Sequence, residues 1–182
     1  MIGAGRRKSV KAGGYRAGMS GPLRILIMCT GNSARSILGE ALLRDLGAER
    51  FEAFSAGSQP KGAPHPAALA LLAARGHATD GLSSKSWDMF AGAGAPKLDA
   101  VITVCASAAG ETCPVFYGAP ARAHWGLDDP AAVTEPPEAV AAAFAATYAA
   151  LETRVKALVA APGADLAPDR IAATLNAIHA AA

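Results

Sequence analysis

The chain has 182 residues, which is enough for one domain with a substantial core, and 52% of them are hydrophobic although only 5% are aromatic. No hydrophobic stretch approaches the length of a membrane span, and three cysteines without Cys-x2-4-Cys spacing argue against both a disulfide framework and a structural zinc site. The formal net charge is +2, but five of the 17 basic residues lie within residues 1–18, so the rest of the chain, with 12 Lys and Arg against 15 Asp and Glu, is mildly acidic.

Residues 1–21 are predicted to form a disordered basic extension, and residues 22–182 a single domain. The extension is rich in Gly, Ala, Lys and Arg and has no hydrophobic periodicity. Either translation starts further downstream, near Met19, or the extension is an arm that binds nucleic acid; we favour the first and expect no nucleic-acid partner. The first apolar run is interrupted by Arg24 and is too short for a signal peptide, so we expect a cytoplasmic protein without membrane association.

The predicted elements alternate between strands and helices along the chain. Short apolar runs indicate the strands, and apolar residues at helical spacing or long alanine-rich stretches indicate the helices. In chain order we expect a strand at 23–28, a helix at 33–46, a strand at 51–55, a helix from about 66 to 76, a short helix at 83–91, a strand at 100–104, a short strand at 122–125, a long helix at 137–159 and a short helix at 169–180. This alternation predicts an α/β fold with a four-stranded parallel sheet and flanking helices.

The segment between the first strand and the first helix has the features of an anion-binding loop. In Cys29-Thr-Gly-Asn-Ser-Ala-Arg-Ser36, Gly31 permits a close backbone approach and Asn32 tolerates a left-handed backbone. Backbone N–H groups at a helix N-terminus can surround one anion, and Arg35 adds a guanidinium that matches two oxygens of a tetrahedral oxyanion. We expect the oxyanion to be bound by Thr30, Gly31, Asn32, Ser33, Ala34, Arg35 and Ser36.

The same positive surroundings favour Cys29 as a thiolate nucleophile, and Ser36 is close enough in sequence to donate a hydrogen bond to it. The alternative is that Cys29 is a small buried hydrophobe at the end of a strand. Cys105 also follows a predicted strand directly. Because ligands of parallel sheets bind beyond the carboxyl ends of the strands, we expect both thiols at the same edge of the molecule.

The Cys29 loop resembles the phosphate-binding loop of the low-molecular-weight protein tyrosine phosphatase superfamily. Within residues 23–160, further matches follow in the expected order: Asn32, Glu40, Ser55-Ala-Gly57 and His124-Trp-Gly-Leu-Asp-Asp-Pro130. The similarity is closest to the branch of arsenate reductases built on that fold. It implies a three-layer domain with flavodoxin-like winding that reduces arsenate to arsenite, for arsenic detoxification, without a cofactor.

Phosphatase-type chemistry needs a proton donor for the leaving oxygen, and Asp128-Asp129-Pro130 can supply it. By similarity Asp129, the residue before the proline, takes the role of general acid. The alternative is a surface turn without a chemical role.

Seven residues separate Cys105 from Cys113. The two cysteines are either a redox pair or isolated thiols, buried by packing or lying at the surface. A disulfide between them requires Cα atoms within about 7 Å of each other. The resemblance implies a relay in which Cys29 attacks arsenate, Cys105 attacks the sulfur of Cys29, and Cys113 attacks Cys105. It further implies thioredoxin or glutaredoxin as the reductant.

Two other functions compete with the arsenate reductase. A low-molecular-weight phosphotyrosine phosphatase would use Cys29, Arg35 and Asp129 alone, but such enzymes usually carry an aromatic residue after Asp-Pro, where this chain has Ala131 and Ala132. A non-enzymatic module that senses anions or associates with nucleic acid leaves the thiols unexplained. We expect a monomer for which phosphate and sulfate compete with arsenate.

Some members of this superfamily bind potassium behind the loop through an Asn, a Glu, a Ser and an Asp. Asn32, Glu40 and Ser55 match, but no Asp is evident in residues 83–87, where Lys85 is close enough to supply the positive charge. We therefore predict no metal ion and no requirement for potassium. Among the histidines, we expect His65 and His77 in solvated loops and His179 exposed. His124 is expected to position the loop that carries Asp129.

Overall fold

A computed structural model describes residues 21–105, 116, 118 and 120–182. Its elements follow the predicted order of strands and helices. They are β1 (Leu23–Cys29), α1 (Arg35–Gly47), β2 (Phe51–Gly57), α2 (Pro66–Ala74), the 3-10 turn η1 (Trp87–Phe90), β3 (Ala100–Thr103), β4 (Ala121–His124), η2 (Pro130–Ala132), α4 (Pro137–Ala160), η3 (Gly163–Leu166) and α5 (Ile171–Ala181). The predicted basic extension lies almost wholly outside the described residues.

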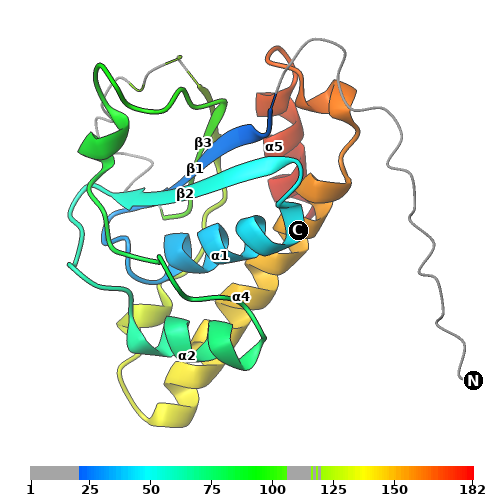
Figure 1. The fold of residues 1–182 in the computed structure, drawn as a ribbon. Coiled ribbons are helices and arrows are strands. Elements are labelled where there is room, and N and C mark those ends of the chain that lie inside the picture. Colours follow the sequence, from blue (N-terminus) through cyan, green and yellow to red (C-terminus); the bar gives the residue numbers. More distant parts are fainter. Residues whose placement is uncertain (1–20, 106–115, 117, 119) are drawn as a thin grey trace, which may run out of the picture.

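The four strands form one sheet in the order β2-β1-β3-β4, and every neighbouring pair is parallel. Each strand therefore ends at the same edge of the sheet (Figure 1). Register pairs Cys29 at the end of β1 with Gly57 at the end of β2. The predicted α/β class and the parallel four-stranded sheet are confirmed.

The two faces of the sheet are covered by hydrophobic cores of different size. Alternate residues of β1, among them Ile25 and Ile27, pack with α1, α4 and α5 in the larger core, and α1 and α4 lie side by side over this face (Figure 1). The opposite side chains, Leu26 and Met28, pack against Phe90 of η1 and a few other apolar residues. β1 is thus buried on both faces, as its uninterrupted apolar sequence predicts.

The prediction of a helix at 83–91 is wrong for the first half of that segment. Only Trp87–Phe90 forms a 3-10 turn, and the preceding residues are extended. The Lys85 carbonyl accepts a hydrogen bond from the Gly57 N–H, and Ser86 forms a parallel bridge with Gly57. Pairing with the end of β2 satisfies backbone groups that a helix would otherwise have satisfied, so the segment follows the sheet instead.

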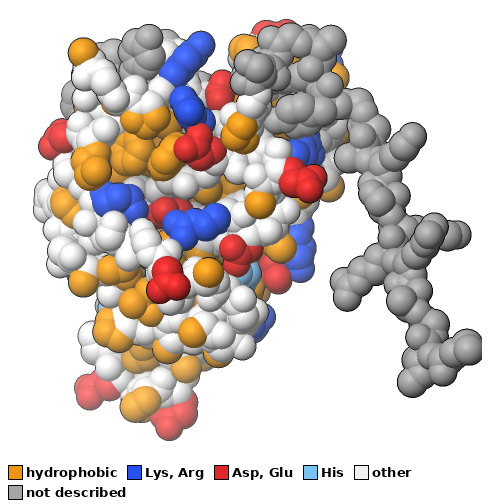
Figure 2. Space-filling model, in the orientation of Figure 1, with side chains coloured by type: hydrophobic (Ala, Val, Ile, Leu, Met, Phe, Trp, Pro, Cys, Tyr) orange, Lys and Arg blue, Asp and Glu red, His pale blue; other side chains and the backbone are white. Residues whose placement is uncertain are grey.

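Basic and acidic side chains are interspersed on the face shown in Figure 2, beside a patch of hydrophobic ones. This mixture agrees with a near-neutral body whose basic excess lies in the first residues of the chain. Within the part of the chain that the structure describes, no helix is long and apolar enough to cross a membrane.

Candidate active site

The loop after β1 turns sharply before α1 begins. Asn32 has a φ of +40°, the left-handed backbone conformation expected for it. A further close backbone approach occurs at Gly57 of β2, where the strand lies against the loop. A Cβ atom on Gly57 would lie 2.4 Å from the Thr30 carbonyl oxygen, whereas one on Gly31 would meet only the methylene groups of Lys61. The Ser55-Ala-Gly57 motif therefore supports the loop from below.

Cys29 lies at the floor of this loop with a hydroxyl group and a backbone N–H directed at its sulfur. The Ser36 hydroxyl is 3.0 Å from Sγ, and the Asn32 backbone N–H donates to Sγ at 3.2 Å. Cys29 is only 3% exposed, yet it lines the cavity described below. The sulfur therefore has polar neighbours and borders a cavity, in addition to packing at the end of a strand.

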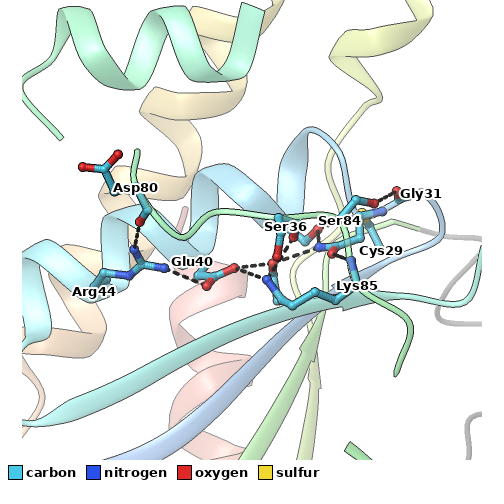
Figure 3. Close-up of polar contacts among 11 residues, drawn as sticks. Cys29, Gly31, Ser36, Glu40, Arg44, Asp80, Ser84 and Lys85 are labelled. Carbon is cyan, nitrogen blue, oxygen red and sulfur yellow. Dashed lines mark hydrogen bonds and ion pairs between the residues drawn. The ribbon is translucent and has the colours of Figure 1, made fainter. Parts of the chain in front are cut away.

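The side chains of Asn32 and Ser36 lie behind the loop, where they are fully buried. Asn32 Nδ2 donates to Ser36 Oγ and to Ser55 Oγ, each at 2.9 Å, and Oδ1 accepts the Lys85 backbone N–H at 2.6 Å. A backbone N–H can only donate, and this fixes the orientation of the amide. Ser55 donates in turn to the carboxylate of Glu40. Figure 3 shows this network extending from the Cys29 loop to Glu40.

On the solvent side of the loop, Arg35 contacts the segment that contains the predicted general acid, Asp129. Its Nη2 lies 3.0 Å from Asp129 Oδ2, and its Nη1 donates to the Leu127 carbonyl at 3.0 Å. Nε of Arg35 is buried and has no hydrogen-bond partner among the described residues. A guanidinium with an unpaired donor, in the lining of the same cavity as Cys29, is suited to bind an oxyanion.

A cavity of about 250 Å³ opens over this arrangement. Its lining combines predicted loop residues with two that the sequence analysis missed. The lining residues are Cys29, Thr30, Gly31, Ser33, Ala34, Arg35, Gln59, Lys61, Asp129 and Ala131. Gln59 and Lys61 are held there by their backbone N–H groups, which donate to the carbonyls of Thr30 and Gly31. Their position two and four residues after Gly57 is the signal that could have identified them.

Cys105 is buried at the same sheet edge as Cys29, as predicted from the strand ends. Its Sγ lies 3.6 Å from Thr30 Oγ1, so Cys105 borders the loop directly. Cys113 lies outside the described residues, and the disulfide pairing remains a prediction.

The histidines are less exposed than expected. His77 is not in a solvated loop: its ring lies 2.5 Å from Asp45 Oδ2 and 2.7 Å from the Tyr148 hydroxyl. His179 is partly buried, with its ring centroid 6.2 Å from that of His124. Burial, then the positive charges of Arg154 and His124, lower the pKa of His179. In the described part of the chain, no three His, Cys, Asp or Glu side chains cluster as metal ligands would.

The family model described as "Low molecular weight phosphotyrosine protein phosphatase" matches residues 24–170, which include every element from β1 to η3. The chain belongs to this family. Its members include proteins that are named for arsenate rather than for phosphotyrosine. "Arsenate reductase 2" of Staphylococcus saprophyticus is 35% identical over 107 residues, which are 59% of this chain and 78% of that protein.

Solved structures of the family share the fold. An arsenate reductase from Archaeoglobus fulgidus has a TM-score of 0.59 at 27% identity and covers 75% of this chain and 99% of its own. A thioredoxin-dependent arsenate reductase from Corynebacterium glutamicum has a TM-score of 0.56 at 24% identity, covering 76% of this chain and 61% of its own.

Proposed function

We propose that this protein is a cytoplasmic arsenate reductase that works through a disulfide relay. The observation that carries the proposal is a cysteine sulfur bonded to a backbone N–H and to a hydroxyl group, on the floor of a cavity that is also lined by Arg35 and Asp129. The names of the relatives point to arsenate as the oxyanion. Phosphate and sulfate have the same tetrahedral shape, so both compete for the cavity.

The first step is attack of the Cys29 thiolate on arsenic. The loop N–H groups and Arg35 hold the arsenate oxygens. Asp129 takes up a proton once arsenate has displaced it from Arg35, and it gives that proton to the departing hydroxyl group, which leaves as water. To reach the anion, Arg35 exchanges its ion pair with Asp129 for one with arsenate. The product is a covalent Cys29–arsenate adduct.

Reduction follows when the Cys105 thiolate attacks Sγ of Cys29. A Cys29–Cys105 disulfide forms, the sulfur–arsenic bond breaks, and its electron pair leaves with arsenic as arsenite. Cys113 then attacks Cys105, which releases Cys29 as a thiolate and leaves a Cys105–Cys113 disulfide. An external dithiol, thioredoxin or glutaredoxin, reduces that disulfide. The contact between Cys105 and Thr30 supports the second step, because it brings the second sulfur to the loop.

Hydrolysis of phosphotyrosine is the competing function, because the family is named for it. The lining of the cavity argues against this function. Ala131, two residues after Asp129, lies in the lining, and none of the described residues adds an aromatic side chain beside it. A phenyl ring would have no partner for stacking there.

Four proteins separate the two functions: wild type, Cys29→Ser, Cys105→Ser and Cys113→Ser. Sedimentation first verifies that each protein is a monomer. Each is then assayed for arsenate reduction with thioredoxin or glutaredoxin, and for hydrolysis of an aryl phosphate. We expect Cys29→Ser to lose both activities, and Cys105→Ser to lose arsenate turnover while slow hydrolysis persists. Arsenate turnover that survives in a Cys105→Ser, Cys113→Ser double variant would exclude the relay.

A further inference from the structure

Behind the loop, the buried carboxylate of Glu40 lies between two cations. Its side chain is 5% exposed, and Lys85 Nζ lies 3.2 Å from Oε2 while Arg44 Nη2 lies 2.8 Å from Oε1. Figure 3 shows both cations directed at Glu40 from opposite ends. Burying a carboxylate without a counter-charge is costly, so at least one of these cations is required for the carboxylate to remain there.

The residues in this place do not fit a diffusible monovalent cation. Lys85 Nζ itself lies between Glu40 Oε2 and the Ser83 carbonyl oxygen, at 3.2 and 2.9 Å. The Asn32 amide oxygen already accepts a backbone N–H, and the Ser55 hydroxyl already donates to Glu40. The oxygens that could have coordinated potassium are thus engaged, two of them by the ammonium group.

A directed path of hydrogen bonds leads from Glu40 to the nucleophile. Because Ser55 donates to the carboxylate, its oxygen is free to accept from Asn32 Nδ2. Nδ2 also donates to Ser36 Oγ, which leaves the Ser36 hydrogen to be donated to Cys29 Sγ. Lys85 acts on this path at two points: its backbone N–H fixes the Asn32 amide, and its ammonium group lies beside the carboxylate that orients the Ser55 hydroxyl.

We propose that Lys85 is a built-in cation that takes the place of a diffusible one and, through Glu40, directs the Ser36 hydroxyl at the Cys29 thiolate. Lys85 is a positioning residue, since it does not line the cavity. The inference deepens the proposed function, but it concerns the reactivity of Cys29 itself. It can therefore be tested whether or not the protein reduces arsenate.

The test compares Lys85→Ala with Lys85→Met in the Cys105→Ser, Cys113→Ser background, where Cys29 is the only cysteine of the chain. Alanine opens space that a small cation can fill, whereas methionine removes the charge but keeps that space filled. The rate of Cys29 alkylation by iodoacetamide is measured in choline chloride, potassium chloride and ammonium chloride at equal ionic strength. Lys156→Met, at a lysine 60% exposed on α4, is the control for loss of one surface charge.

In choline chloride we expect both Lys85 variants to react about tenfold more slowly than the parent. Potassium or ammonium should restore Lys85→Ala to within twofold and leave Lys85→Met slow. Lys156→Met and the parent should respond to neither ion. In the three-cysteine enzyme, Lys85→Met should lower kcat for arsenate reduction while KM stays within twofold, because the cavity lining is unchanged.

Alkylation of Lys85→Met at the parental rate would overturn the inference, since the charge would then be dispensable. A slow Lys85→Ala that neither ion restores would also overturn it, because the lysine would then act through packing alone. Lys85→Met is nearly isosteric with lysine, so it keeps the test decisive if Lys85→Ala does not fold. Failure of the proposed function appears separately, as absence of arsenate turnover in the wild type.

Discussion

Ion pairs lie on both sides of the Cys29 loop, and they differ in the burial of the carboxylate rather than in length. In front, Arg35 and Asp129 are 3.0 Å apart, with side chains 12% and 45% exposed. Behind, Lys85 and Glu40 are 3.2 Å apart, with side chains 17% and 5% exposed. Water therefore screens the front pair at Asp129 and reaches the Glu40 carboxylate of the rear pair much less.

This difference suits the two pairs to different tasks. Because the Asp129 carboxylate is half-exposed, water can solvate it once an oxyanion has replaced it as the partner of Arg35, so this exchange costs little. Removing one partner of a buried pair leaves a charge without compensation, which costs up to several kcal/mol. The front pair can therefore exchange during turnover, while the rear pair holds the loop in place throughout.

The largest effect on activity is expected from Arg35→Lys, which removes the guanidinium of the front pair. Lysine keeps the charge but loses the guanidinium donors that match two oxygens, so kcat/KM for arsenate should fall about 10³-fold. The melting temperature should change much less than the activity, because lysine keeps the positive charge beside the half-exposed Asp129. Arg24→Lys, in an exposed ion pair with Glu52, is the matched control and should retain full activity. A loss below tenfold in Arg35→Lys would mean that the loop N–H groups alone bind the anion.

Asp129→Asn should reduce the rate of the first step about 10²-fold, because asparagine cannot donate a carboxyl proton to the departing oxygen. KM for arsenate should not rise, since Arg35 loses its competing partner. Rapid-quench measurement of Cys29–arsenate formation checks both points. Asp128→Asn provides the control at the neighbouring position, which does not line the cavity. Equal effects of the two substitutions would argue against Asp129 as the acid.

Gly57→Ala tests the rigid rear side without altering a charge. The new methyl group would lie 2.4 Å from the Thr30 carbonyl oxygen, so the loop backbone has to move. We expect a loss of about 1–3 kcal/mol in the free energy of unfolding, measured by urea titration. Gly31→Ala, whose methyl group meets only the flexible Lys61 side chain, should be destabilised less. The reverse order would show that the loop is not supported by β2.

The smallest effect concerns His179, whose pKa in the folded protein is lowered from its usual 6.5. Below that value the unfolded chain binds a proton that the folded protein binds less readily, so this group's contribution to stability is present above pH 6.5 and is lost as the pH falls. Urea titrations of wild type and His179→Gln at pH 7.5 and 5.5 measure the difference. Wild type should lose more stability than the variant on acidification; equal losses would place the sensitivity in other groups.

The fold was largely predictable because its signals are local. β1 is a continuous apolar run, α4 is a long alanine-rich stretch, and both occur within about two residues of the predicted bounds. The exception is the segment that contains Lys85, which pairs with Gly57 of β2 instead of forming a helix. A hydrogen-bond partner 28 residues away leaves no trace in the local pattern.

The Cys29 loop and the helix N-terminus after it were predictable for the same reason, since Cys29 through Ser36 are consecutive. Gln59 and Lys61 were missed because their place in the cavity depends on backbone bonds to the loop across the sheet edge. His77 was misplaced because its partners, Asp45 and Tyr148, lie 32 and 71 positions away.

The sequence by itself determined that a cysteine follows a buried strand and precedes a helix with an arginine in its first turn, because covalent neighbours and helical geometry are enough to form an anion-binding loop. Only the tertiary structure decided which charges lie in front of that loop and which lie behind it. Lys85 reaches Glu40 across 45 positions, and Arg35 reaches Leu127 across 92. The strength of such pairs depends on burial, which is a property of the folded sheet and not of the residues' order.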